Sequence, residues 1–412
     1  MKHWYLSQYF KTIATKRVSA VEVNKVTSNQ HEFNWTNELK RLFGEVWSEK
    51  INIKAKFLYL NDYDDEIIED TWVLTWYDAR ARSFEKTGRT EYRLYFPDTN
   101  VLNCASEWDL LIIAQEPSWE ALVIIAENES TILNQLLWLF GISESHPWFS
   151  IKSELETEQD RIEFASRMIL ETIGIEIEMS NENYLDDMLR RFWNNTFPLT
   201  KVFSEYARST IQKEAIKEEK ADSLILMFME KEEILFRTFE KYLLAERLSK
   251  WFMNEWNPDV DSFINFSLHV QNRRKSRAWA GFENHLEYIF QSQWVRFSRT
   301  GITENKSKPD FIFPWIMEYR DQNFPNSKLN ILWAKTSCKD RWRQVLSEAN
   351  RVDDKHLITL QTAISETQTD EMRIHKLQLV IPTRLQQTYT QRQQDWLIWL
   401  DDFIIVVRNN LL

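Results

Sequence analysis

Glycine is scarce in this chain of 412 residues, and it never occurs in clusters. A loop that binds phosphate, or a turn that binds a dinucleotide, needs closely spaced glycines so that the backbone can approach the phosphates. The sequence therefore disfavours nucleotide-driven chemistry and Rossmann oxidoreductases. The six glycines stand alone, at Gly44, Gly88, Gly141, Gly174, Gly281 and Gly301.

Cysteine and long apolar runs are also scarce. Cys104 and Cys338 lie far apart in the sequence and match neither a zinc-binding spacing nor a disulfide framework, which favours a reducing, cytoplasmic location. Residues 1–20 lack a sustained apolar segment, and no later run reaches the ~18 apolar residues of a membrane helix. We therefore expect a protein that neither spans nor enters a membrane.

Acidic residues outnumber basic ones, and the formal net charge is −11 at pH 7. Taken alone, this charge argues weakly against a nucleic-acid ligand. The charges are unevenly distributed, however, because residues 61–70 and 182–188 are acidic whereas residues 272–278 and 335–343 are basic. Such a chain can repel DNA with most of its surface and still hold it in one basic cleft.

The length predicts two or three domains, and a hydrophobic content of 43% is enough for well-filled cores. Residues 1–145 contain short β-rich runs separated by polar turns, which indicates a small barrel or sandwich. Helical periodicity follows over residues 150–250. The remaining pattern predicts an α/β sheet flanked by helices. Its elements are a helix at 279–291, strands at 309–313 and 328–336, a helix at 340–351, and strands at 357–360 and 377–382.

Several acids and one lysine stand out in this C-terminal part. Asp310 opens one predicted strand and Lys335 ends the next, so their side chains can meet at one edge of the sheet. Glu348 follows on the next predicted helix. A further acid comes from the earlier helix, as Glu283 or Glu287, which are four residues apart and share one face.

Carboxylates of this kind suit a hard, oxygen-liganded cation such as Mg²⁺, which lowers the pKa of bound water and neutralises charge that builds on a phosphate. A lysine beside them can orient that water and stabilise the transition state electrostatically. Together these groups predict a phosphodiesterase. A Pro-Asp pair is also typical of a turn, and a lysine at the end of a strand is typical of a solvated cap, so spacing alone leaves both interpretations open.

A series of motifs runs through the C-terminal half: TFPLTKVFSEYARS, NRRKSRA, ENHLEYIF, ITENKSKPDFIFP, LWAKTSCKDRWRQVLSEANRV, HLITLQTAIS and LQLVIP. In their order and intervals, these motifs resemble the catalytic domain of the EcoRII-type restriction endonucleases, from about Phe197 to Pro382. The resemblance implies a PD-(D/E)XK nuclease fold, with a central mixed sheet flanked by helices. It also implies that the acid normally two residues before the lysine has moved to the following helix. Trp333 occupies the vacated position, and Glu348 occupies the new one.

The resemblance implies a role for each residue of the site. Asp310 is the principal metal ligand, Lys335 is the catalytic lysine and Glu348 is the displaced acid. Glu283 is the helix carboxylate, and with the other two acids it is expected to bind Mg²⁺. Where the family commonly reads RAG, this chain reads RAWAGFE, which leaves open the choice between the two helix glutamates. Tyr319, in MEYRDQNFP, matches a tyrosine near the family's active site.

Charged residues at the start of the helix predicted over 340–351 are candidates for reading bases. Arginine can donate two hydrogen bonds to guanine, and aspartate can accept one from cytosine, which suits a G·C-rich site. The resemblance implies the CC:GG portion of a recognition sequence. A solvated helix start with ion pairs is the alternative. The candidates are Lys339, Asp340, Arg341 and Arg343.

A second basic cluster is expected to bind phosphates, because a dense group of cations has no base-specific spacing. A plain basic loop is the alternative. The cluster comprises Arg273, Arg274, Lys275 and Arg277. His285 and His356 have no partner at a metal-ligand spacing, so we expect both to be structural.

The N-terminal half carries a second resemblance. The run TWYDARARSFEKTGRTEYRLYF, residues 75–96, followed by WDLLIIAQ, is similar to the effector-binding domain of the same enzymes, a B3-like DNA-binding pseudobarrel. Residues 16–32 resemble its first DNA-contacting arm, although TSNQ stands here in place of a glycine-rich segment. An exposed charged hairpin is the alternative. The candidate DNA contacts are Arg17 and His31 on one arm, and Arg80, Arg82, Lys86, Arg89, Glu91 and Arg93 on the other.

The two resemblances imply a Mg²⁺-dependent Type II restriction endonuclease that is stimulated by effector DNA. Its expected parts are an effector-binding domain at 1–145, a helical connection at 146–196 and a catalytic domain at 197–412. Its partners are duplex DNA, as target and as effector, and a cognate DNA methyltransferase; a homodimer is consistent with the family. The alternatives are a nuclease that responds to modified cytosine and a non-cleaving DNA-binding regulator. The acids and the lysine favour the enzyme, since a binder has no chemical need for them.

Overall fold

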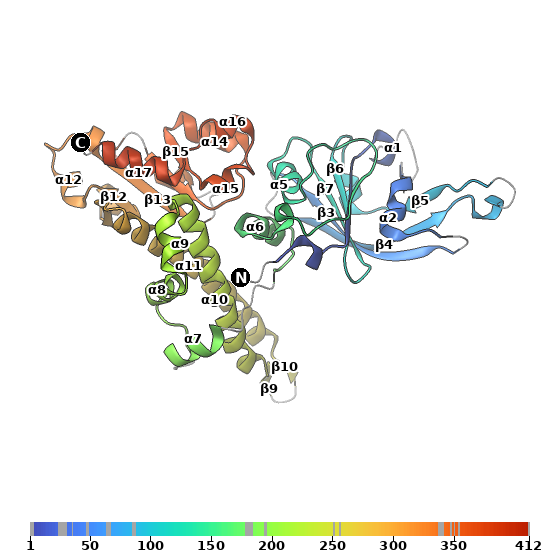
Figure 1. Cartoon of the computed structure of the whole chain (residues 1–412), viewed down its shortest axis with the longest axis horizontal. Helices are drawn as coiled ribbons and strands as arrows, with labels where there is room; N and C mark the ends of the chain where they lie inside the picture. Colours follow the sequence, from blue (N-terminus) through green and yellow to red (C-terminus); the bar gives the residue numbers. More distant parts are fainter. Residues whose placement is uncertain are drawn as a thin grey trace. The chain divides into compact units, whose positions relative to one another are not determined.

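The chain forms two compact units (Figure 1). The first comprises Met1–Glu176 with Thr388–Thr390, and the second comprises Ile177–Gln387 with Gln391–Leu412. Each unit has its own sheet. The structure, a computed structural model, describes residues 4–23, 31–34, 36–46, 49–62, 67–84, 88–177, 184–192, 196–249, 252–254, 257–336, 342–346, 348–349, 351–352 and 355–410.

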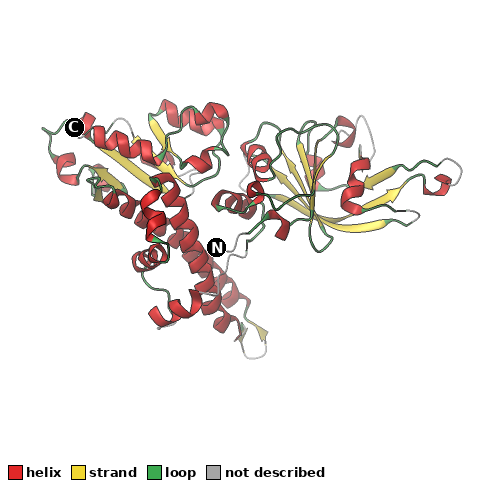
Figure 2. Ribbon diagram, viewed as in Figure 1, coloured by secondary structure: helices red, strands yellow, loops and turns green. Residues whose placement is uncertain are grey.

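The first unit is built on an eight-stranded sheet with the order β2-β5-β4-β3-β7-β6-β1-β8. Figure 2 draws the strands of both units in yellow. Strands β3 and β7 run parallel, and the other neighbouring strands run antiparallel. The strands are β1 (Thr12–Arg17), β2 (Glu32–Phe33), β3 (Ile51–Leu60), β4 (Ile68–Asp78), β5 (Tyr92–Tyr95), β6 (Leu110–Gln115), β7 (Ala121–Ala126) and β8 (Ser150–Lys152).

The core of this unit lies along the middle of the sheet. Strands β6 and β7, with the sequences LLIIAQ and ALVIIA, are buried at every position, as in strands that are covered on both faces. Helices and turns connect the strands: η1 (Leu6–Gln8), α1 (Ala20–Val23), η2 (Thr36–Leu39), α2 (Lys40–Phe43), η3 (Ala81–Ser83), α4 (Asn100–Cys104), α5 (Thr131–Leu139), η4 (Glu158–Asp160) and α6 (Phe164–Thr172).

The β-rich character expected for residues 1–145 is present, and β3 coincides with the predicted run INIKAKFLYL. The B3-like topology stays a prediction. The unit also continues beyond residue 145, because β8 pairs with β1 along the sheet edge and α6 follows it. Part of the segment expected as a connection, 146–196, therefore belongs to the first unit.

The second unit begins with helices. Two of them are long, α10 (Ala221–Ser249) and α11 (Val260–Ser292), and they pack against each other and against α8. The helix predicted over 279–291 is thus the second half of a much longer one. The other elements in this part are α7 (Leu185–Arg191), α8 (Thr200–Ser209), α9 (Lys213–Glu218), β9 (Met253–Asn254) and β10 (Asn257–Pro258).

A five-stranded mixed sheet follows, with the order β11-β12-β13-β14-β15. The first three strands are antiparallel neighbours, and β13, β14 and β15 run parallel. The strands are β11 (Ser298–Arg299), β12 (Phe311–Phe313), β13 (Asn330–Lys335), β14 (Lys355–Thr359) and β15 (Leu377–Val380). The helices are η6 (Glu304–Lys306), α12 (Ile316–Arg320), η7 (Asn326–Lys328), α13 (Trp342–Leu346), α14 (Glu366–Ile374), α15 (Thr383–Gln386), α16 (Gln391–Gln394) and α17 (Leu400–Asn409).

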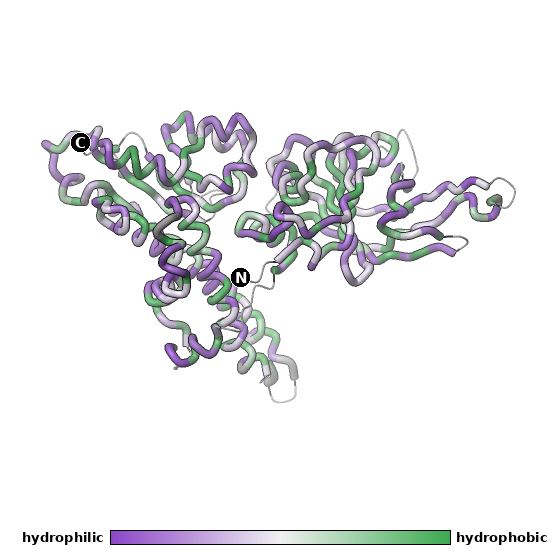
Figure 3. Tube along the Cα trace, viewed as in Figure 1, coloured by the Kyte–Doolittle hydropathy of each residue, from purple (hydrophilic) through white to green (hydrophobic). Residues whose placement is uncertain are grey.

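Aromatic packing holds α11 and α17 on this sheet. The ring of Phe290, on α11, lies edge-on to Phe311 and Phe313 of β12, at centroid distances of 5.2 and 5.3 Å. Phe403, on α17, packs on Phe313 at 5.5 Å. In Figure 3 these strands are hydrophobic, whereas helices α14 and α16 are largely hydrophilic. The predicted α/β architecture is confirmed. The strands predicted from residue 309 onward are present in the predicted order along the chain.

The helix predicted over 340–351 is shorter in the structure. Helix α13 spans Trp342–Leu346, and Glu348 lies in the turn that follows. The next residue, Ala349, has a φ of 55°, which is incompatible with a right-handed helix. The expectation that Glu348 lies on a helix is therefore wrong. Among the residues that the structure describes, no helix is both long and apolar enough to cross a membrane.

Candidate functional site

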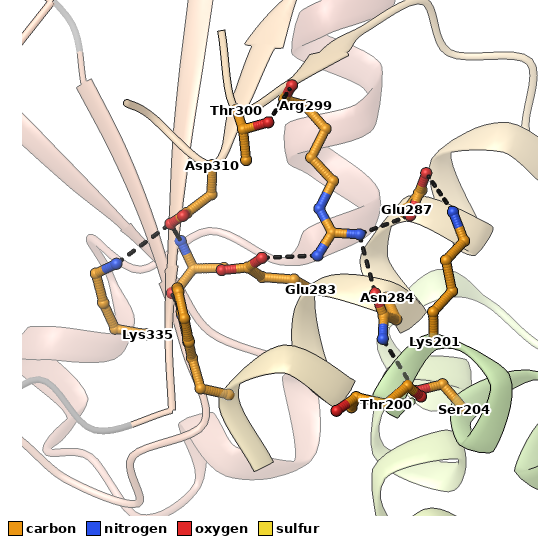
Figure 4. Close-up of polar contacts among 12 residues, drawn as sticks. Thr200, Lys201, Ser204, Glu283, Asn284, Glu287, Arg299, Thr300, Asp310 and Lys335 are labelled. Atoms are coloured by element: carbon orange, nitrogen blue, oxygen red, sulfur yellow. Dashed lines mark hydrogen bonds and ion pairs between the residues drawn. The ribbon is translucent and has the colours of Figure 1, made fainter. Parts of the chain in front are cut away.

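Asp310 and Lys335 meet at the edge where β12 begins and β13 ends (Figure 4). Strand β12 pairs with β13 up to Phe311 opposite Leu332. Beyond that point the N–H of Ala334 donates a hydrogen bond to Oδ2 of Asp310, at 2.8 Å, and Nζ of Lys335 lies 3.3 Å from the same oxygen. The predicted meeting of these two side chains is present, and only 5% of Asp310 is exposed.

Glu283 supplies a second carboxylate at this edge. It projects from α11, two helical turns before Phe290, and aromatic packing of Phe290 on β12 fixes this part of the helix beside Asp310. Burial and the negative charge of Asp310 raise the pKa of Glu283 to about 7. Its Oε1 is buried and accepts no hydrogen bond from any described residue. Two adjacent carboxylates, one with an unused buried oxygen, are a donor set that fits a Mg²⁺ ion, since Mg²⁺ needs few protein ligands and keeps several waters.

Arg299, on β11, holds the α11 acids in place. Its guanidinium donates to Glu283 at 2.7 Å, to Glu287 at 2.7 Å and to the side-chain oxygen of Asn284 at 2.9 Å (Figure 4). Glu287 also lies 3.5 Å from Nζ of Lys201. Of the two helix glutamates considered from the sequence, Glu283 therefore lies beside Asp310, whereas Glu287 is held between two cations. Neither Arg299 nor Asn284 was found by sequence reasoning, because their role depends on a strand and a helix meeting in space.

Glu348 is held by a tryptophan. Nε1 of Trp333 donates to Oε2 of Glu348 at 2.8 Å, from the strand position that the family's missing acid would occupy. Within the described part of the chain, no three acidic, histidine or cysteine side chains gather closely enough to bind one metal ion. The structure thus brings Asp310, Lys335 and Glu283 together, and it connects Glu348 to them through β13.

Trp279 lies beside Lys335 at the site. Its Nε1 donates to the carbonyl oxygen of Ala334 at 3.1 Å, and Nζ of Lys335 lies 5.5 Å from its ring centroid. Trp279 precedes Glu283 by four residues, so both face β13 from one side of α11. The sequence analysis did not select Trp279. The signal was present, since this residue lies in the RAWAGFE segment where the chain departs from the family pattern that it resembles.

Tyr319 is buried in α12, and its hydroxyl bonds a carboxylate other than Asp310 and Glu283. The hydroxyl donates to Glu304 at 2.6 Å, and burial together with this contact raises the pKa of Tyr319. The guanidinium of Arg351 donates to the backbone carbonyl of Tyr319 and to that of Asp321. In this structure the Tyr319 side chain therefore links α12 to η6, which precedes β12.

The basic cluster on α11 is divided between the surface and the interior. Arg274 forms an ion pair of 2.8 Å with the buried carboxylate of Glu240. Arg277 donates to the carbonyl of Pro198 at 2.9 Å and lies over the ring of Phe197. Arg273 also lies over the Phe197 ring, at 5.1 Å, and Lys275 is exposed. Arg274 and Arg277 are thus engaged inside the unit, and phosphate binding by the cluster stays a prediction.

Of the candidates for reading bases, only Arg343 lies within the described residues. It forms an exposed ion pair of 2.8 Å with Glu371 on α14. Lys339, Asp340 and Arg341 lie outside the described residues, so their predicted role stays a prediction.

The candidate DNA contacts of the first unit are partly engaged with one another. Arg17 donates to Ser145, Asn128 and the carbonyl of Trp108 at distances of 2.6 to 2.9 Å, so it ties the end of β1 to neighbouring loops. Glu91 accepts from Arg80 and Arg93, which lowers the pKa of Glu91.

The remaining candidates of this unit lie at the surface or outside the described residues. His31 lies beside the rings of Tyr95 and Phe96. Arg82 and Arg89 are exposed. Lys86 lies outside the described residues.

Two histidines were expected to be structural, and both are buried. His285 lies in α11 between Glu232, 2.8 Å from Nε2, and Arg208, whose guanidinium donates to Nδ1 at 2.9 Å. Because Nδ1 accepts, Nε2 carries the proton of a neutral ring. His356 packs against the ring of Phe403 at 4.9 Å. Neither histidine contributes to the site at Asp310.

The geometry defines a class: a mixed α/β unit with an acid, a lysine and a second acid at one sheet edge. Comparison with known proteins shows which proteins this unit resembles. Residues 236–404 match the family described as EcoRII C terminal. The chain is 35% identical over 237 residues to the Type II restriction enzyme EcoRII of Escherichia coli, covering 57% of this chain and 56% of that protein. This C-terminal part of the chain is thus similar to the EcoRII-type enzymes.

The chain spans about half the length of this curated relative, at 56%. Two solved structures are also similar. Metal-depleted Ecl18kI in complex with uncleaved, modified DNA has a TM-score of 0.44 and 17% identity, over 56% of this chain and 84% of that chain. The restriction endonuclease PspGI–substrate DNA complex has a TM-score of 0.41 and 13% identity, over 52% of this chain and 93% of that chain.

Proposed function

We propose that this protein is a Type II restriction endonuclease that hydrolyses phosphodiester bonds of duplex DNA with Mg²⁺. The observation that carries the proposal is the meeting of Asp310, Lys335 and Glu283 around the backbone of Ala334. The 35% identity to a Type II restriction enzyme supports it.

Each residue of the site has a distinct task. The N–H of Ala334 fixes Asp310, and Lys335 is held 3.3 Å from that carboxylate, where its ammonium can stabilise negative charge that develops on a phosphate. Arg299 fixes Glu283 from the opposite side. When bound, Mg²⁺ would neutralise charge on the phosphate and lower the pKa of water. Asp310 and Glu283 would hold it, and the family resemblance implies Glu348 as a third acid.

Recognition of a site containing CC:GG is assigned to the segment from Lys339 to Arg343. The family resemblance supports this assignment, as does the basic character of the segment. Arg343 is paired with Glu371 across an exposed surface, and a pair of this kind is weak enough to exchange for a base or phosphate. A homodimer and a methyltransferase for the same site complete the proposed system.

The first unit is proposed to bind a second copy of the site as an effector. Its separate sheet and core support an independent binding role. Arg82 and Arg89 are exposed next to the ion-paired group of Arg80, Glu91 and Arg93, which provides a charged surface for a DNA backbone.

The test is digestion of a plasmid of random sequence with the purified protein in Mg²⁺ or in EDTA, followed by sequencing of the ends. Cleavage at one short motif in Mg²⁺ is expected, and Asp310→Asn is the matched inactive control. Specific binding without any cleavage would instead identify a DNA-binding regulator. Parallel digestion of methylated and unmethylated DNA separates a nuclease that requires modified cytosine, which would cut only the methylated DNA.

A further inference from the structure

Trp333 and Glu348 form a hydrogen bond beside the candidate site. The indole N–H of Trp333 donates to Oε2 of Glu348 at 2.8 Å, and only 2% of Trp333 is exposed. The donor is buried and the acceptor carboxylate is half-buried, so water has little access to the N–H and the bond restrains the acceptor.

The geometry of β13 determines on which face of the sheet this bond holds Glu348. Side chains alternate along a strand, so Trp333 and Lys335, two residues apart, emerge on the same face of β13. The bond therefore draws the carboxylate of Glu348 towards the face of the sheet that carries Lys335. The intervening Ala334 uses its backbone for Asp310 and Trp279.

Glu348 needs such a partner because of where it lies. It follows the end of α13, in a turn whose next residue, Ala349, has a φ of 55°. A glutamate in a turn can adopt many rotamers, and fixing them costs conformational entropy. On a strand, an acid two residues before Lys335 would be oriented by the backbone itself. Here a side chain has to supply that orientation.

We propose that Trp333 is a positioning residue for Glu348: its indole N–H holds, on the face of Lys335, a carboxylate that the strand itself does not provide. The inference rests on the proposed function, in which Glu348 is the displaced acid of the site. Trp333 does not touch substrate or metal, and it acts only through Glu348.

The experiment compares Trp333→Phe, which keeps an aromatic ring but removes the donor, with Trp399→Phe as a matched control. Trp399 lies in the same unit, and its indole donates to the neutral side-chain oxygen of Gln386 at 3.0 Å, away from the site. Losing a hydrogen bond to a charged group is expected to slow cleavage by about 10- to 100-fold. The Mg²⁺ concentration for half-maximal rate should rise in parallel. Trp399→Phe should retain the wild-type values.

A second readout needs neither metal nor cleavage. The indole ¹⁵N–¹H resonance of Trp333, identified by its loss in Trp333→Phe, should move when Glu348→Gln replaces the charged acceptor. Should Trp333→Phe fail to fold, Trp333→His, which can keep a ring N–H, serves for both measurements and should retain more cleavage than Glu348→Gln. An unmoved indole resonance, or wild-type cleavage by a folded Trp333→Phe, would overturn the inference.

The outcomes separate this inference from the proposed function. If Glu348→Gln leaves cleavage unchanged, Glu348 is not an acid of the active site and that part of the proposed function is wrong. If Glu348→Gln abolishes cleavage while Trp333→Phe has no effect, the proposed function stands and the role of Trp333 is wrong.

Discussion

The backbone of Ala334 is the point at which the site is assembled. Its N–H donates to Asp310, and its carbonyl accepts from Trp279. Both groups point to the side on which β12 no longer pairs with β13. A polar backbone group that leaves strand pairing needs another partner, and here the partners are the residues of the site.

At this scale Lys335 provides the first prediction. Lys335→Ala should abolish cleavage while DNA affinity stays within a few-fold, because the ammonium acts mainly on the transition state. Cleavage of a plasmid and fluorescence anisotropy with labelled DNA in EDTA measure the two effects. Lys275→Ala is the matched control, and it should weaken binding but retain cleavage at saturating DNA. Equal loss of binding and cleavage in Lys335→Ala would contradict the assignment.

Glu283 provides a prediction about pH. Its pKa is raised from 4.5 to about 7 by burial and by the charge of Asp310, so the folded protein keeps a proton that the unfolded chain releases. The stability from this proton is present below pH 4.5 and is lost as pH rises towards 7. The loss is on the order of 1–3 kcal/mol.

Urea unfolding in EDTA, repeated in steps of about one pH unit from pH 5 to pH 8, measures this loss of stability. Glu283→Gln should show a smaller decrease of stability over the range than the wild type does. Asp222, whose pKa is raised to about 7 by burial and by Asp401, contributes a decrease of the same sign to both proteins. Identical slopes for the two proteins would show that Glu283 is not protonated in the folded chain.

At the scale of elements, α11 and β12 are joined by aromatic packing, and this packing places Glu283. Phe290 is completely buried between Phe311 and Phe313. Because Glu283 and Phe290 lie on one rigid helix, a change at Phe290 is transmitted to the site.

Phe290→Ala should therefore destabilise the protein by about 3–5 kcal/mol and reduce cleavage even where the protein is still folded. Phe263→Ala on the same helix is the control, since Phe263 is 51% exposed and should change stability by less than ~0.5 kcal/mol. Thermal unfolding and cleavage rates at a temperature well below the transition measure both. Full activity of a folded Phe290→Ala would show that the packing of Phe290 on β12 is not needed to position Glu283.

At the scale of the whole molecule, the chain has two units with separate sheets and separate cores. In the second unit, the helices α8, α10 and α11 pack together, and α11 also packs on the mixed sheet. A unit with its own core has the means to fold alone.

The fragment Ile177–Leu412 should consequently fold and cut a DNA with a single site at least as well as the full chain does. A short duplex that carries the site should stimulate the full chain and leave the fragment unaffected, since a ligand shifts an equilibrium only by its differential affinity for two states. Circular dichroism and cleavage rates check the prediction. A folded fragment that cuts none of the DNAs cut by the full chain would show that the first unit is required for catalysis.

The sequence by itself determined the strands of the second unit from residue 309 onward and the meeting of Asp310 with Lys335. The apolar runs at β12, β13 and β14 are long enough to be recognised as buried strands, and the placement of Asp310 and Lys335 at strand ends follows from them. Only the tertiary structure decided that Glu283 rather than Glu287 lies beside Asp310. It also decided that Arg277 faces the interior and that Trp333 holds Glu348. Local patterns report which face of an element is apolar, whereas these contacts depend on the rotation of α11 against the sheet and on the turn after α13, which packing between distant residues sets.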